Sequence, residues 1–197
     1  MTSGGDPGTA KSAVRARLLA RRRARSAADR ATAADTLSAG LIEGLAGAGT
    51  VAAYVPEETE PGFGRLPDDF TRLGVRVLLP VVPAGGHDLS WAVHTGRLTP
   101  GRFGLLEPDG ERLEPAALAS ADVVVLPALA VSRDGVRLGR GGGFYDRALR
   151  HAQPGAVLVA LVFDDEFVED LPTEPHDRRV TAVVTPAGGW QELPGGR

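Results

Sequence analysis

The hydrophobic positions of this chain follow helical spacing before residue 50. Residues 10–49 are rich in Ala, Leu and Arg and contain neither proline nor a run of β-branched residues, a composition that favours helix. Ser26 or Asp29 can begin a second helix. Its apolar face recurs at helical spacing and comprises Ala34, Leu37, Leu41 and Leu45. We therefore expect an N-terminal helical hairpin over residues 10–49.

After residue 50 the pattern changes to short apolar runs bounded by proline or glycine, which indicate buried strands. The strongest run, DVVVLP at residues 122–127, suits a sheet that is covered on both faces. Pro56 and Pro80 are expected to end two other strands. The expected strands cover residues 51–55, 75–79, 89–93, 122–127, 157–162 and 180–184. The expected helices or helical turns cover residues 63–73, 116–120 and 144–151.

Strands that alternate with helical segments predict the α/β class, with one open, largely parallel sheet flanked by helices. The length of 197 residues fits one domain, and 43% hydrophobic and 24% charged residues are ordinary globular proportions. We expect a single domain over residues 10–186. Residues 1–9 are small and turn-forming, and residues 187–197 carry no clear pattern, so both tails are expected to be disordered.

Composition excludes several classes of protein. There is no cysteine, which excludes disulfides, thiol catalysis and cysteine-ligated metal centres. The four histidines share no metal-ligand spacing, and no window reaches the roughly 18 apolar residues of a membrane span. The basic run at residues 21–23 is not followed by the apolar stretch of an export signal. A cytoplasmic protein without membrane contact is expected.

Charge is unevenly distributed along the chain. The net charge is −3, yet residues 1–30 contain eight basic residues and only two acidic ones. Such a segment can meet phosphate, although a solvated helix face is the simpler interpretation. An RNA-binding or regulatory protein led by this helix would show steep salt dependence of binding. Few aromatic residues lie among the arginines, so no nucleic-acid partner is expected.

The most informative stretch is GVRLGRGGGFYDRAL at residues 135–149. Four glycines in five positions permit positive φ and leave backbone N–H groups uncovered, which can form an anion-binding nest. The expected helix start and the nearby arginines add positive charge. Asp146 beside a phosphate is useful where Mg²⁺ lies between them, although it is also a favoured residue for a first helical turn. A phosphate site is expected, with a flexible surface loop as the alternative.

This stretch resembles the signature of the 5-formyltetrahydrofolate cyclo-ligases, also called methenyltetrahydrofolate synthetases, which is approximately G-x-R-L-G-x-G-x-G-[YF]-Y-D-R-x-L. Other segments between residues 11 and 185 resemble the family in the same order. They are the K-x-x-x-R pair Lys11 and Arg15, YVP followed by Glu60-Pro61, FGLLEP at 103–108, DVVVLP at 122–127 and LPTEPHD at 171–177. Two positions depart from the family pattern: Phe144 replaces a frequent tyrosine, and Glu166 stands where glutamine is expected.

The resemblance implies an ATP- and Mg²⁺-dependent conversion of 5-formyltetrahydrofolate to 5,10-methenyltetrahydrofolate with release of ADP and phosphate. In that reaction the formyl oxygen is phosphorylated and N10 of the substrate attacks the activated carbon. The partners would be a reduced folate and ATP, and the protein would be a monomer. A phosphosugar isomerase or acyl-transfer enzyme on a similar scaffold, or a nucleotide-binding regulatory paralogue, is the alternative, because a scaffold does not fix function.

The resemblance also implies site residues. Arg140 and Asp146 would be catalytic, and Asp146 and Asp177 would hold Mg²⁺. Glu60 is preferred to Glu57 and Glu58 as the pterin acceptor because it precedes Pro61. The residues expected at the folate are Val55, Glu60, Arg140, Gly142 and Phe144. Those expected at ATP are Lys11, Arg15, Arg137, Leu138, Gly139, Arg140, Gly141, Gly142, Gly143, Phe144 and Tyr145.

Overall fold

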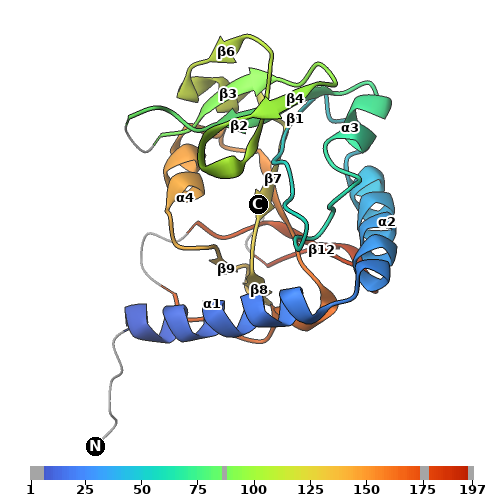
Figure 1. Ribbon diagram of the computed structural model, residues 1–197, viewed down its shortest axis with the longest axis vertical. Helices are drawn as coiled ribbons and strands as arrows, with labels where there is room; N and C mark the ends of the chain where they lie inside the picture. Colours follow the sequence, from blue (N-terminus) through green and yellow to red (C-terminus); the bar gives the residue numbers. More distant parts are fainter. Residues whose placement is uncertain (1–6, 86–87, 174–177, 195–197) are drawn as a thin grey trace, which may run out of the picture.

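One large sheet organises the chain in the computed structural model, which describes residues 7–85, 88–173 and 178–194 (Figure 1). Its eight strands within these ranges, from one edge to the other, are β13 (Gly189–Glu192), β12 (Ala182–Thr185), β10 (Val157–Leu161), β7 (Val123–Pro127), β1 (Thr50–Ala52), β2 (Arg76–Val81), β3 (Ser90–Val93) and β6 (Arg112–Leu113). The five strands from β12 to β2 are parallel to one another. Outside them, the pairs β12–β13, β2–β3 and β3–β6 are antiparallel. The predicted α/β class with a largely parallel sheet is confirmed.

Smaller elements surround this sheet. The helices are α1 (Pro7–Ala24), α2 (Ala27–Gly44), α3 (Asp68–Arg72) and α4 (Phe144–Ala148), with 3-10 turns η1 (Arg102–Gly104), η2 (Pro115–Ser120), η3 (Leu149–His151) and η4 (Asp164–Glu166). A small sheet joins β11 (Phe167–Val168), β8 (Ala130–Ser132) and β9 (Arg137–Leu138), and a ribbon joins β4 (Leu98–Pro100) and β5 (Leu106–Pro108). No helix in the described ranges has the length and apolar character needed to cross a membrane.

The two N-terminal helices form where they were expected, but they do not form a hairpin. Ser26 caps α2, where its hydroxyl accepts the backbone N–H of Asp29 at 3.1 Å. Figure 1 shows α1 running across the small sheet and α2 running along the large sheet, so the helices lie crosswise. Each helix covers its own apolar surface, since Leu37 and Leu41 pack on the large sheet while Leu18 packs on the small one. The hairpin expectation is therefore wrong.

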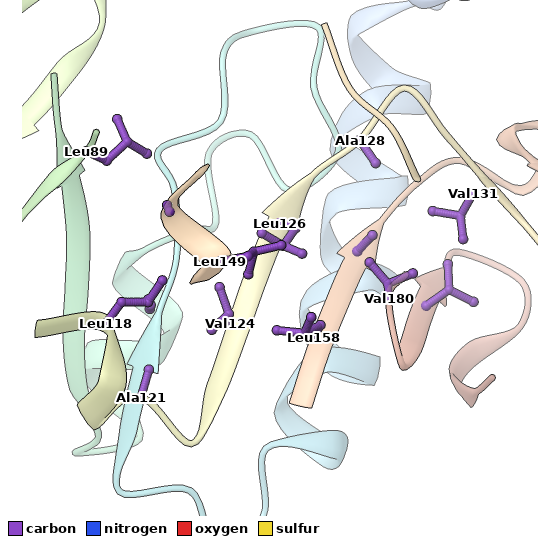
Figure 2. Packing of buried hydrophobic residues seen from close by; sticks show 14 of the residues in the cluster. Leu89, Leu118, Ala121, Val124, Leu126, Ala128, Val131, Leu149, Leu158 and Val180 are labelled. Carbon is purple, nitrogen blue, oxygen red and sulfur yellow. The ribbon is translucent and has the colours of Figure 1, made fainter. Parts of the chain in front are cut away.

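Side chains alternate between the two faces of the central strands, as strand geometry requires. In β7, Val123 and Val125 face the core beneath α2 and α3. Val124 and Leu126 face the opposite core, which also contains residues from η2, α4 and η3 (Figure 2). Both faces of β7 are thus buried, which explains why this strand is a continuous apolar run.

Three expected boundaries at prolines are wrong. Strand β1 ends at Ala52 and does not extend to Pro56. Strand β2 continues through Pro80 to Val81 instead of stopping there. β1 ends opposite Leu78, so Pro80 has a neighbouring strand on one side only and its missing N–H is tolerated. The helix expected over residues 63–73 is shortened to α3, which begins directly after Pro67.

Both tails contain structure that was not expected. α1 already includes residues 7–9, and β13 pairs antiparallel with β12 at the edge of the sheet. The Trp190 ring packs so closely on α2 that a Cβ added to Gly44 would lie 2.1 Å from its Cε3 atom. Leu193 is buried beyond the strand. The expectation of a disordered tail from residue 187 is therefore wrong for residues 189–192.

This packing predicts that Gly44→Ala destabilises the protein. The added methyl group overlaps the Trp190 ring, and overpacking of this kind costs about 1–3 kcal/mol of unfolding free energy. Gly155→Ala is the control, because a Cβ there meets no atom within 4 Å. Urea unfolding followed by tryptophan fluorescence measures both variants. Equal midpoints for the two variants would contradict the packing of β13 on α2.

Candidate active site

The parallel strands place a crevice between β1 and β7. From β1 the chain moves to β2 on one side, and later it returns to β7 on the other side of β1. Ligand crevices in open α/β sheets form at such a reversal, beyond the carboxyl ends of the strands. Tyr54 and Val55 follow β1, and Pro127 and Ala128 lie at the end of β7. A cavity of about 330 Å³ lies among them.

The loop after β1 continues along the wall of this cleft, and three other segments complete it. They are the end of β2, the tip of the β4–β5 ribbon, and the segment from β9 through the glycine-rich loop to the first turn of α4. The residues they contribute are Glu57, Glu60, Pro80, Val82, Leu105, Leu106, Glu107, Arg137, Gly139, Arg140, Gly141, Gly142, Gly143, Phe144, Tyr145 and Asp146. Carboxylates and arginines from distant parts of the sequence therefore face one cavity.

The glycine-rich loop is held through its carbonyl groups. Arg15 Nε donates to the carbonyl of Gly139 at 2.9 Å, and Arg147 Nη2 donates to that of Gly142 at 2.9 Å. Gly141 and Gly143 have φ of 99° and 66°, the left-handed conformations that glycine adopts without strain. Within the described chain, the backbone N–H groups of residues 140–143 donate no hydrogen bond. The loop therefore offers a run of free donors at the wall of the cleft, as an anion nest does.

Arginine supplies most of the positive charge here, because α4 is only five residues long and its dipole is small. The Arg137 side chain is buried, with Nη1 donating to Pro127 O at 3.1 Å and Nη2 donating to Asp146 Oδ1 at 2.5 Å. Its buried Nε has no partner in the described part of the molecule. Arg137 thus positions Asp146 at the cleft and retains a donor that an added acceptor would satisfy.

Glu60 is a buried carboxylate on the opposite wall. Its Oε2 accepts the Glu57 backbone N–H at 2.9 Å, and its Oε1 lies 3.1 Å from Arg140 Nη2. Arg140 also pairs with the Glu57 carboxylate. Burial raises the pKa of Glu60, while the Glu57 amide and the positive charge of Arg140 oppose that rise. The cleft therefore contains a desolvated hydrogen-bond acceptor whose side-chain partner is Arg140, a half-exposed residue of the glycine-rich loop.

Two tyrosines lie near Glu60: Tyr54 is buried and Tyr145 is partly buried. The Tyr54 hydroxyl lies 3.4 Å from the carbonyl of Pro61, to which it donates. Burial raises the pKa of Tyr54 well above its ordinary value, and it raises that of Tyr145 as well, with the nearby Glu60 charge acting in the same direction. Both side chains are neutral near pH 7 and serve as apolar walls that carry a hydroxyl donor.

Most of the predicted site residues come together in this cleft, although their roles remain predictions. Leu138 does not line it, since its side chain packs in the core with Leu18 and Leu129 and leaves only its backbone for a ligand. Lys11 is buried on α1, one turn before Arg15, which bonds to the glycine-rich loop, and neither residue lines the cavity. Asp177 lies outside the described residues.

The sequence interpretation missed part of the cleft. Glu107 is buried, and its Oε1 accepts the backbone N–H of Val82 at 2.9 Å, which ties the ribbon to the end of β2. Leu105 and Leu106 line the cavity beside it. The FGLLEP motif was the signal for these three residues, but a motif does not reveal which of its side chains turn inward.

Glu166, the other departure from the family pattern, does not line the cleft. It is buried against Arg22 of α1, and neighbouring Asp165 pairs with Arg21 and Arg25. The basic run of α1 is thus largely engaged with carboxylates of its own chain, which disfavours the interpretation of this helix as a polyanion-binding surface.

The sheet topology and the cleft at its reversal place this chain among the α/β proteins that have a ligand-binding crevice at the carboxyl ends of their strands. The match to known families gives the same answer more specifically. Residues 7–186 match the family described as the 5-formyltetrahydrofolate cyclo-ligase family, and the chain belongs to this family of enzymes.

Individual relatives agree. A 5-formyltetrahydrofolate cyclo-ligase of Mycolicibacterium smegmatis is 44% identical over 185 residues, covering 91% of this chain and 95% of the relative. The Escherichia coli protein of the same name is 35% identical over 146 residues, covering 72% and 80%. The solved structure of the Aquifex aeolicus 5,10-methenyltetrahydrofolate synthetase is also similar, with a TM-score of 0.73 and 28% identity. The superposed region covers 95% of this chain and 94% of the Aquifex chain.

Proposed function

We propose that this protein converts 5-formyltetrahydrofolate to 5,10-methenyltetrahydrofolate with consumption of ATP in the presence of Mg²⁺. One observation carries the proposal beyond family membership. The loop with free amide donors and the buried Glu60 carboxylate face each other across a single cavity. One wall suits phosphate and the other suits a ring with N–H donors, so both reactants can meet between them.

The chemical problem is a stable formamide, whose oxygen is a poor leaving group. Attack of that oxygen on the γ-phosphorus of ATP forms the O–P bond, breaks the bond to ADP and creates a leaving group. N10 then attacks the formyl carbon, loses its proton and expels phosphate, which closes the ring. The substrate supplies both nucleophiles, so the protein contributes orientation and charge stabilisation.

The glycine-rich wall is assigned to ATP. The backbone N–H groups of residues 140–143 and the Nε–H group of Arg137 would donate hydrogen bonds to phosphate oxygens, and Lys11 and Arg15 would add positive charge from α1. Tyr145 would pack beside the nucleotide. Arg140 lies at the boundary between the two walls, where it would stabilise charge on the transferred phosphoryl group.

Asp146 is the described residue suited to Mg²⁺. In the described ranges no three His, Cys, Asp or Glu side chains converge as a metal cage. Mg²⁺ bound to a nucleotide does not need one, since it combines one or two carboxylates with phosphate oxygens and water. Asp146 fits this requirement as a carboxylate held at the cleft by Arg137, and Asp177 is proposed as the second ligand. When bound, the Mg²⁺ ion would neutralise part of the negative charge on the phosphates.

The opposite wall is assigned to the folate. Glu60 would accept hydrogen bonds from the amino group and ring N–H of the pterin. Val55, Gly142 and Phe144 would contact the ring system, and the phenylalanine retains an aromatic plane although it lacks a tyrosine hydroxyl. A monomeric state, a cytoplasmic location and the absence of a nucleic-acid partner stay predictions.

The direct test is a spectrophotometric assay of the purified protein with 5-formyltetrahydrofolate and MgATP. Near-ultraviolet absorbance of the methenyl product should rise only when ATP and Mg²⁺ are both present. Omission of each reactant in turn provides the controls. No rise from a folded protein that binds ATP would mean that the nucleotide site serves a different acceptor.

Asp146→Asn should reduce kcat by about a hundredfold or more, the scale of losing one charge-stabilising contact in a transition state. The amide keeps the size of the side chain but cannot provide an anionic ligand to Mg²⁺. Asp35→Asn is the control, because Asp35 pairs with Arg65 away from the cleft. Circular dichroism checks that both variants fold, and near-normal turnover by the Asp146 variant would refute its role with the metal.

Folate binding should weaken on acidification through protonation of Glu60. The carboxylate is the accepting form, and its raised pKa means that it takes up a proton at a higher pH than the ordinary value of 4.5. Affinity is therefore complete above the folded pKa and is lost as the pH falls through it. Calorimetric titrations from about pH 8 to pH 5 measure this loss.

Glu60→Gln and Glu58→Gln separate the two neighbouring glutamates. The Glu60 variant should bind folate weakly at every pH, whereas the Glu58 variant should keep the wild-type profile, since Glu58 is exposed and pairs with Arg30. ATP affinity should change little in either. A wild-type profile in the Glu60 variant would remove Glu60 from the folate site.

A further inference from the structure

A buried ion pair joins three distant segments beneath the cleft. Arg22 of α1 and Glu166 of η4 each expose only 1% of their side chains. Arg22 Nε and Nη2 donate to the two carboxylate oxygens of Glu166, both at 2.8 Å. Nη2 also donates at 2.6 Å to the carbonyl of Ala128, a cleft-lining residue just after β7. The Phe163 backbone N–H donates to Glu166 at 3.0 Å, so the carboxylate is fully engaged.

Stability alone does not explain this pair. Desolvation of two charges offsets much of their attraction, and apolar replacements of a buried ion pair are often equally stable. A planar guanidinium also fixes the relative positions of its acceptors, because its donors point in fixed directions. Here those directions lock α1, the end of β7 and η4 into one arrangement.

The inward face of α1 shows what this arrangement controls. Lys11, Arg15, Leu18 and Arg22 recur at intervals of four, three and four residues, which places them on one side of the helix. At one end of this face Arg22 bonds to Ala128, and at the other Arg15 bonds to Gly139. Between them α1 makes a small apolar contact, in which Leu18 is buried and Val14 and Leu19 are partly buried.

An apolar contact with only one buried side chain defines the register of a helix poorly. A shift by one turn moves every side chain on the face by about 5.4 Å. Such a shift would carry Arg15 away from Gly139. The Arg22 fork opposes it, since the three acceptors that receive its bonds lie on segments other than α1.

We propose that Arg22 and Glu166 are positioning residues for the nucleotide: their buried pair fixes the register of α1 against the floor of the cleft and thereby places Lys11 and Arg15 at the glycine-rich loop. The inference rests on the proposed function, in which these two side chains help to hold ATP. Arg22 and Glu166 do not line the cleft themselves, so they act through α1.

A double-mutant cycle tests this indirect action. Arg22→Met should weaken MgATP binding, measured by calorimetry, by about tenfold, within the range of coupled neighbouring sites. Arg15→Ala should weaken it in the wild-type background but by less than about twofold in the Arg22→Met background, because Arg15 is already displaced. Fully additive effects, or an unchanged affinity in Arg22→Met, would overturn the proposal.

Arg25→Met is the matched control. Arg25 directly follows the end of α1 and pairs with Asp165, the neighbour of Glu166. Its side chain is 26% exposed and, within the described part of the chain, donates no hydrogen bond to Ala128. Arg15→Ala should retain its full effect in this background. If Arg22→Met does not fold, Arg22→Lys replaces it in the cycle, because lysine keeps the charge but lacks the fork.

Hydrogen–deuterium exchange without nucleotide separates this proposal from the proposed function. Amides of residues 11–19, which are hydrogen-bonded within α1, should exchange faster in Arg22→Met and stay at wild-type rates in Arg25→Met. A wild-type protein that binds no MgATP would contradict the proposed function, and the exchange rates would still decide the role of the pair. Unchanged exchange in both variants would overturn the proposal that the Arg22–Glu166 pair fixes the register of α1.

Discussion

The reversal of strand order between β1 and β7 is the constraint on which the rest of the structure depends. The carboxyl ends of these two strands are not bridged by a shared connection, so a crevice stays open above a sheet whose two faces are both buried. Rigid strands thus fix the floor. The glycine-rich loop, the segment that carries Glu60 and the β4–β5 ribbon are all attached near these ends, which is why residues far apart in sequence share one cavity.

Buried charge is the second organising feature. Arg22 and Arg137 each direct their donors to a backbone carbonyl at the end of β7 and to a carboxylate, Glu166 and Asp146 respectively. Such pairs contribute little net stability, but they orient groups that apolar packing would leave free to shift. In the proposed reaction the substrate supplies its own nucleophiles, so orientation is the main contribution that the protein makes.

The sequence allowed prediction of those parts that a local pattern encodes. Strand β7 was predictable because burial on both faces requires a continuous apolar run, and the loop at residues 139–143 was predictable because its glycines are contiguous. β13 and the small sheet were missed, since strands of two to four residues carry little periodicity. Arg22 and Glu166 are separated by 144 positions, and one sequence without an alignment gives no sign that they pair. Leu138 was placed at the nucleotide because it lies within the motif, whereas its side chain turns into the core.

In the proposed reaction the formyl oxygen becomes the nucleophile toward ATP within this cleft. Oxygen-18 placed in the formyl group of 5-formyltetrahydrofolate tests it most directly, with mass spectrometry of the released phosphate after turnover with unlabelled MgATP in unlabelled water. Each released phosphate should carry one labelled oxygen, since the O–P bond formed in the first step is retained when phosphate leaves. Unlabelled phosphate from a reaction that still yields the methenyl product would contradict it, because the formyl oxygen would then have left without being phosphorylated.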